Sequence, residues 1–126
     1  MTQTAKKLLV MDDDVDFAEL VSRVGAELGY SVLTLTESRR FQAEFAAFRP
    51  DVVFLDIVMP DIDGTQLVRW LSRDAPTIRL IIATGYNPYY LHLAETLGQV
   101  AGLVPVAQLR KPIPLDELRA ALKAAL

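Results

Sequence analysis

An uninterrupted apolar run from Val52 to Leu55, followed at once by Asp56, constrains the fold more than any other stretch of the sequence. A run with no polar alternation is typical of a strand buried on both faces, as strands of a parallel sheet are. The carboxyl ends of such strands border the ligand crevice of an open α/β sheet, so the Asp56 carboxylate is expected there. Taken alone, Asp56 is better explained as a turn residue or a helix cap, and only polar residues elsewhere in the chain favour a functional role.

Similar strands alternate with helices along the whole chain. The predicted strands are Leu8–Met11, Tyr30–Thr36, Val52–Asp56, Ile78–Ala83 and a stretch near 104–109. The predicted helices run from Asp14 as N-cap to Gly29, over Phe41–Phe48, from Asp63 or Gly64 through Leu71, over about 89–97, and over about 115–126. Five strands alternating with five helices predict an α/β fold with a doubly wound parallel sheet, formed by a single domain over residues 1–126.

Composition excludes several classes of function. The 126 residues carry a net charge of -3 with no basic cluster, which argues against direct nucleic-acid binding. The absence of cysteine excludes disulfides and thiol catalysis, and the single histidine, His92, is expected to be an ordinary surface residue. The apolar run Leu8–Met11 is too short for a signal peptide, and no run approaches a membrane-spanning length, so a cytoplasmic location is expected.

Polar residues that end four of the predicted strands suggest a phosphoryl site. Asp12 and Asp13 follow the first strand, Asp56 ends the third, and Thr84 and Lys111 follow the fourth and fifth. In a parallel sheet these ends converge on one crevice. Clustered carboxylates repel one another unless a cation intervenes, and Mg²⁺ prefers oxygen ligands. With a hydroxyl and an ammonium added, the group suits phosphoryl transfer to a carboxylate.

These residues, in this order, resemble the receiver domains of bacterial two-component response regulators over nearly the whole chain. The motifs that carry the resemblance are Val10-Met-Asp12-Asp13-Asp14, Phe54-Leu-Asp56-Ile-Val-Met-Pro60 with Gly64, Ala83-Thr84-Gly85 and Lys111-Pro112. The resemblance implies a flavodoxin-like (βα)5 fold with strand order 2-1-3-4-5. It also implies a signalling domain rather than a metabolic enzyme, one that catalyses only its own phosphorylation and a slow loss of the phosphoryl group.

The resemblance assigns the metal ligands. Asp12 and Asp13 would form the acidic pair that binds Mg²⁺, with Asp13 in direct contact. Asp56 would share the ion, and the backbone carbonyl of Val58 would complete the protein's ligands. Asp14 is expected only to cap the helix that follows.

The resemblance also assigns the groups that handle phosphate. Asp56 would accept the phosphoryl group, Thr84 would supply the switch hydroxyl, and Lys111 would pair with the phosphate. The Lys111–Pro112 peptide bond would be cis, which would aim the lysine into the crevice. Phosphorylation would add roughly -1.5 to -2 charges and switch the binding of partners.

Two features depart from the family pattern. Receivers usually carry Tyr or Phe three residues before the lysine, whereas this chain has Gln108, so the aromatic half of the usual switch is missing. We expect the loop and helix that contain Tyr86, Tyr89 and Tyr90 to carry the change instead. The segment between Thr84 and Lys111 is also longer than usual, which would alter the face on which partners dock.

Two positions that flank the site bear on the lifetime of the phosphoryl group. Val58 lies two residues after the acceptor, and Tyr86 lies two residues after Thr84. Neither side chain is suited to orient an attacking water. The sequence therefore predicts slow self-dephosphorylation.

The expected partners are a sensor histidine kinase or a histidine phosphotransfer protein, and a target that docks on the fourth helix, fifth strand and fifth helix. A homodimer is a further expectation, and contact with nucleic acid or membrane is not expected. One alternative is a pseudo-receiver that binds partners without phosphate. Another is a haloacid-dehalogenase-like phosphohydrolase with Asp12 as nucleophile, but Asp16 stands where that motif needs Thr or Val.

Overall fold

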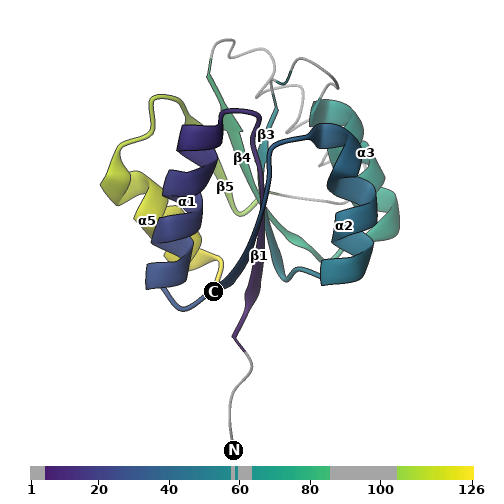
Figure 1. Ribbon diagram of the computed structural model, residues 1–126, viewed down its shortest axis with the longest axis horizontal. Coiled ribbons are helices and arrows are strands. Elements are labelled where there is room, and N and C mark those ends of the chain that lie inside the picture. Colours follow the sequence, from purple (N-terminus) through teal and green to yellow (C-terminus); the bar gives the residue numbers. More distant parts are fainter. Residues whose placement is uncertain (1–4, 58, 60–63, 86–104) are drawn as a thin grey trace, which may run out of the picture.

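The computed structural model describes residues 5–57, 59, 64–85 and 105–126 (Figure 1). The elements in chain order are β1 (Lys7–Met11), α1 (Val15–Glu27), β2 (Ser31–Leu35), the 3₁₀ turn η1 (Ser38–Arg40), α2 (Phe41–Phe48), β3 (Val52–Asp56), α3 (Gly64–Asp74), β4 (Arg79–Thr84), β5 (Ala107–Arg110) and α5 (Leu115–Ala124). The helix expected over about 89–97 lies outside the described residues.

All five strands form one parallel sheet in the order β2-β1-β3-β4-β5. The register pairs Met11 with Leu55 and Thr84 with Arg110, so the carboxyl ends of the strands lie along one edge. Every residue of β3 is buried, as the uninterrupted apolar run predicts. The fold class and the strand order expected from the sequence are confirmed.

Helices cover both faces of the sheet: α1 and α5 lie on one face and α2 and α3 on the other (Figure 1). Side chains alternate along each strand, so one strand supplies both cores. In β1, Leu8 and Val10 pack under α1 and α5, whereas Leu9 and Met11 pack under α2 and α3. The sheet is thus buried on both sides, which fixes the positions of its strand ends.

Trp70, on α3, is half-buried and packs with its ring nearly perpendicular to Phe41 and Phe45 of α2, at 83° and 90°. Trp70 therefore packs against the core from its edge. None of the described helices has the length and apolar character that crossing a bilayer requires.

Local signals fix both ends of α1. The Asp14 side chain accepts a hydrogen bond from the Phe17 backbone N–H, as an N-cap does. Gly29 follows the helix with a φ of 97°, a backbone conformation that favours glycine. Both were expected from the sequence, and the cap holds the first turn of α1 beside the end of β1.

The end of α5 is attached to the edge of the sheet where the strands begin. The buried Tyr30 hydroxyl, just before β2, donates to the Leu122 carbonyl at 2.7 Å. The Arg79 guanidinium, at the start of β4, donates to the carbonyls of Ala125 and Leu126 at 3.1 and 2.9 Å. Carbonyls in the last turn of a helix lack partners within that helix, and Tyr30 supplies one to Leu122, while Arg79 binds the two residues that follow α5.

Strand boundaries differ from expectation by a few residues. The last strand begins at Ala107 rather than near 104, and Pro105 in between has no N–H to donate to a sheet. The fourth strand covers Arg79–Thr84 rather than Ile78–Ala83. Thr84 is therefore the last residue of its strand and is held by the sheet.

Candidate functional site

Three carboxylates meet where β1 and β3 end. Asp12 directly follows β1, and its backbone N–H donates to the Leu35 carbonyl at 3.1 Å, which extends the sheet by one bond. Asp56 is the last residue of β3. One carboxylate oxygen from each of Asp12, Asp13 and Asp56 lies within 4.8 Å of the others. Asp12 and Asp56 are buried and Asp13 is exposed, so the cluster opens to solvent on one side.

The ammonium of Lys111 lies between the two buried carboxylates. Lys111 Nζ is 2.8 Å from Asp12 Oδ2 and 3.4 Å from Asp56 Oδ2. The Lys111 backbone N–H donates to the Thr84 carbonyl at 2.8 Å, which joins the two strand ends. The Lys111–Pro112 peptide bond is cis, the isomer that the family resemblance implies. Residues 99 positions apart in the chain thus form one ion pair.

Burial and pairing have opposite effects on these charges. Burial raises the pKa of Asp12, and the Lys111 ammonium and the Asp14 backbone N–H counter only part of that rise. Burial alone would lower the pKa of Lys111, but its contacts with Asp12 and Asp56 outweigh burial, and the pKa is raised. Lys111 is therefore a cation at physiological pH, and it partly neutralises a site with more negative than positive groups.

Thr84 brings a hydroxyl to the same edge. It is 1% exposed, and its Oγ1 has no hydrogen-bond partner among the described groups. A buried hydroxyl without a partner costs about 1–3 kcal/mol, so structures seldom retain one without a reason. An acceptor bound at the end of β3 would satisfy it. Carboxylate oxygens for Mg²⁺, an ammonium and a free hydroxyl donor are the groups that hold a phosphoryl group.

Residues 8–123 match the family described as the response regulator receiver domain. The chain belongs to this family. It is 33% identical over 122 residues to the response regulator MprA of Mycolicibacterium vanbaalenii, covering 95% of this chain and 50% of that regulator. It is 28% identical to the sporulation initiation phosphotransferase F of Bacillus subtilis, covering 94% of this chain and 91% of that protein.

The fold agrees with solved receiver structures. A response regulator receiver domain protein from Clostridium thermocellum superposes with a TM-score of 0.79 at 27% identity, covering 95% of this chain and 93% of that one. The receiver domain described here spans about half the length of MprA. Receiver domains act in phosphorelay signalling, so the chain is a signalling domain, and a haloacid-dehalogenase-like hydrolase is not supported.

Gln108 of this receiver domain lies in β5, opposite Ile82 of β4, and is half-buried. The side chain at this position is therefore an amide and not an aromatic ring. The other residues that the sequence analysis singled out near the site, namely the Val58 carbonyl, Tyr86, Tyr89, Tyr90 and His92, lie outside the described residues.

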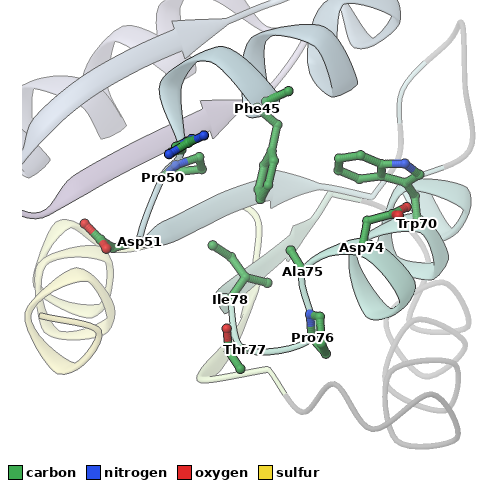
Figure 2. Close-up of a pocket in the computed structure, with 11 residues that line it drawn as sticks. Phe45, Pro50, Asp51, Trp70, Asp74, Ala75, Pro76, Thr77 and Ile78 are labelled. Atoms are coloured by element: carbon green, nitrogen blue, oxygen red, sulfur yellow. The ribbon is translucent and has the colours of Figure 1, made fainter.

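A cleft of about 600 Å³ lies at the opposite edge of the receiver domain, where the strands begin. Phe45 and Trp70 line it with Ile78, and Figure 2 shows Asp51 and Asp74 toward its two sides. Among the described residues that line this cleft there is no acidic cluster paired with a lysine. The chemistry of the residues, rather than the size of the cavity, therefore makes the edge that carries Asp56 the candidate functional site.

The receiver site also includes a side chain that the sequence analysis missed. The Phe17 ring centroid lies 4.6 Å from Lys111 Nζ. Its spacing along α1 marks it as a core residue, and it does pack against the core. One signal could have suggested that Phe17 contacts the site: it lies in the first turn of a helix that directly follows an acidic strand end.

Proposed function

We propose that this receiver domain accepts a phosphoryl group on Asp56 from a phosphohistidine of a sensor kinase or a histidine phosphotransfer protein. The convergence of Asp12, Asp13, Asp56 and Lys111 at one sheet edge is the observation that carries this proposal. The unpartnered hydroxyl of Thr84 at the same edge supports it. Receiver domains generally bind Mg²⁺ at an acidic pocket, and Asp12, Asp13 and Asp56 would hold it here with the Val58 carbonyl.

The transfer proceeds by attack of an Asp56 carboxylate oxygen on phosphorus. The new O–P bond forms an acyl phosphate as the P–N bond to the donor imidazole breaks, and the bonding pair leaves on the imidazole nitrogen. Mg²⁺, when bound, neutralises charge on the phosphoryl oxygens. Lys111 pairs with one of those oxygens, and Thr84 donates a hydrogen bond to another, which gives its buried hydroxyl a partner.

The new charge would then change the balance between two forms of the domain, which partners bind differently. Docking on β5, α5 and the segment before them, a homodimer and a cytoplasmic location remain predictions from the family. Gln108 stands where other receivers place an aromatic switch, so the segment with Tyr86, Tyr89 and Tyr90 is proposed to report phosphorylation. Phosphorylation that leaves the NMR signals of that segment unchanged would contradict this.

The test is intact mass after incubation with acetyl phosphate and Mg²⁺. The wild-type chain is expected to gain one phosphoryl group and Asp56→Asn none. Asp74→Asn, which changes an aspartate at the opposite edge, is the matched control and should behave as wild type. Gain and loss of the adduct over time would also measure its lifetime, which the sequence predicts to be long.

Two results would overturn the proposal. An adduct that persists in Asp56→Asn and maps to Asp12 would indicate the hydrolase chemistry. A folded wild-type chain that binds Mg²⁺ but accepts phosphate neither from acetyl phosphate nor from a panel of phosphorylated histidine proteins would indicate a pseudo-receiver.

A further inference from the structure

The face of the Phe17 ring supports the Lys111 ammonium from the side of α1. Lys111 Nζ lies 4.6 Å from the ring centroid, well within the about 6 Å over which a cation is attracted to an aromatic face. We propose that Phe17 is a positioning residue, which keeps the Lys111 ammonium beside Asp56 while Mg²⁺ occupies the carboxylates. This inference rests on the proposed function, because it concerns the lysine that would pair with the phosphoryl group.

The need for such a support follows from competition for oxygen atoms. Lys111 Nζ contacts one oxygen each of Asp12 and Asp56, and the same two carboxylates belong to the acidic cluster suited to Mg²⁺. A bound divalent ion would repel the Lys111 ammonium and compete with it for the carboxylate oxygens of Asp12 and Asp56. Lysine has a flexible four-carbon stem that can turn to solvent once its partners weaken. The ring does not bind Mg²⁺, so its attraction for the ammonium remains.

Short contacts fix the backbone of Phe17 and link it back to Asp12. The Asp14 backbone N–H donates to Asp12 Oδ1 at 2.9 Å, and the Phe17 backbone N–H donates to Asp14 Oδ1 at 3.2 Å. The Phe17 ring then meets Lys111 Nζ, which donates to Asp12 Oδ2 at 2.8 Å. Asp12, Asp14, Phe17 and Lys111 are thus joined in a ring of contacts. Through these contacts the N-cap of α1 sets the position of the Phe17 ring relative to the Asp12 carboxylate, with which Lys111 pairs.

Phe54 holds the ring from the sheet side. The Phe17 and Phe54 rings have centroids 6.1 Å apart and are tilted by 48°. Phe54 precedes Asp56 by two residues on β3, and residues two apart share a face of the sheet. The support for Lys111 is therefore built on the strand that carries the acceptor, and both would shift together.

Packing alone is the competing explanation, because Phe17 also contacts the core. Replacement of Phe17 by 3,4,5-trifluorophenylalanine separates the two, since fluorination withdraws charge from the ring face while the ring stays nearly the same size. Phe48 offers a matched control at the opposite edge: its ring lies 5.5 Å from Lys7 Nζ, so the same substitution there weakens a similar contact far from the site.

The experiment is calorimetric titration of each chain with beryllofluoride, a mimic of the aspartyl phosphoryl group, at saturating Mg²⁺, with a separate titration of Mg²⁺ alone. Fluorination at position 17 and Phe17→Leu are expected to weaken beryllofluoride binding by about 2- to 10-fold. Affinity for Mg²⁺ should not weaken, because no metal ligand is removed. Fluorination at position 48 should leave both affinities unchanged.

Wild-type affinity for beryllofluoride in the fluorinated Phe17 chain would overturn the inference, as would an equal loss from fluorination at position 48. Loss in Phe17→Leu alone would assign Phe17 to packing and would also overturn it. Failure of the wild-type chain to bind beryllofluoride at all would instead count against the proposed function.

Discussion

Replacement of Tyr30 by Phe should destabilise the fold by removing one hydrogen bond, while the ring and its packing are kept. Tyr30 is 5% exposed, and its hydroxyl is 2.7 Å from the Leu122 carbonyl in the last turn of α5. The N–H of Leu126, four residues on, donates to Lys123 instead, so the Leu122 carbonyl loses its partner in the variant. A buried polar group left unpaired costs about 1–3 kcal/mol, and we expect a loss of about 1–2 kcal/mol.

The same contact makes the stability difference depend on pH. Burial raises the pKa of Tyr30 from 10.0 to about 12, with Asp51 adding to the rise and Arg79 opposing it. Because the folded pKa lies above the unfolded one, the contribution of Tyr30 is complete below about pH 10 and is lost as pH rises toward 12. At one pH unit above the unfolded pKa the loss is about 1 kcal/mol.

Urea unfolding followed by the fluorescence of Trp70, the only tryptophan, measures both effects. With a slope of about 2 kcal/mol per molar urea, the midpoint of Tyr30→Phe should fall by about 0.5–1 M near pH 8. Near pH 11 the difference in the free energy of unfolding between the wild type and Tyr30→Phe should narrow by about 1 kcal/mol. Only the wild-type chain carries the Tyr30 hydroxyl, and all other titrating groups are the same in both chains. Equal midpoints near pH 8, or a gap that stays constant, would refute the reasoning.

Three further perturbations test other parts of the structure. Gly64→Ala should lower the free energy of unfolding by about 1–3 kcal/mol or more, because the new Cβ would lie 2.5 Å from the Ile57 Cα. Gly85→Ala should lower it by under about 1 kcal/mol, because the new Cβ would meet only side-chain atoms, the nearest at 3.7 Å. Thermal melts of the two variants test the difference. Arg49→Gly should stabilise the chain by about 0.5–1 kcal/mol in urea unfolding, since Arg49 has a φ of 54°, and an unchanged midpoint would contradict this. Burial raises the pKa of Asp12 above 3.8, so stability falls as pH rises from the unfolded value of 3.8 through the folded pKa. Mg²⁺ should offset this cost at neutral pH and should raise the melting temperature less and less as pH falls and Asp12 takes up a proton; an effect of Mg²⁺ that does not decline on acidification would contradict this.

The sequence predicted the sheet well because its signals are local. The run Val52–Leu55 has no polar interruption, and a fully buried parallel strand is the structure that such a run suits. The strand ends follow from the same pattern, which is why Asp12, Asp56 and Lys111 could be placed at one edge before their distances were known.

The contacts that sequence reasoning missed join distant parts of the chain through residues with ordinary local roles. Phe17 fits the apolar spacing of α1, and nothing nearby in sequence indicates that Lys111 lies against its ring. Tyr30 directly precedes β2 and Arg79 begins β4, but their side chains donate hydrogen bonds to carbonyls at the end of α5 and just after it. Tyr30 reaches Leu122, 92 residues away, and Arg79 reaches Ala125, 46 residues away. Such pairs depend on how the helices pack, which periodicity does not specify.

The attachment of α5 at Tyr30 and Arg79 has a practical consequence. It places Leu126 at the edge where the strands begin, and Lys7 starts β1 at that same edge (Figure 1). A five-residue strand spans roughly 17 Å, at about 3.3 Å per residue. A tag, dye or solid support joined beyond either residue would therefore be attached about one strand length from Asp56, and immobilised chains would still present an open acidic edge to a phosphodonor protein.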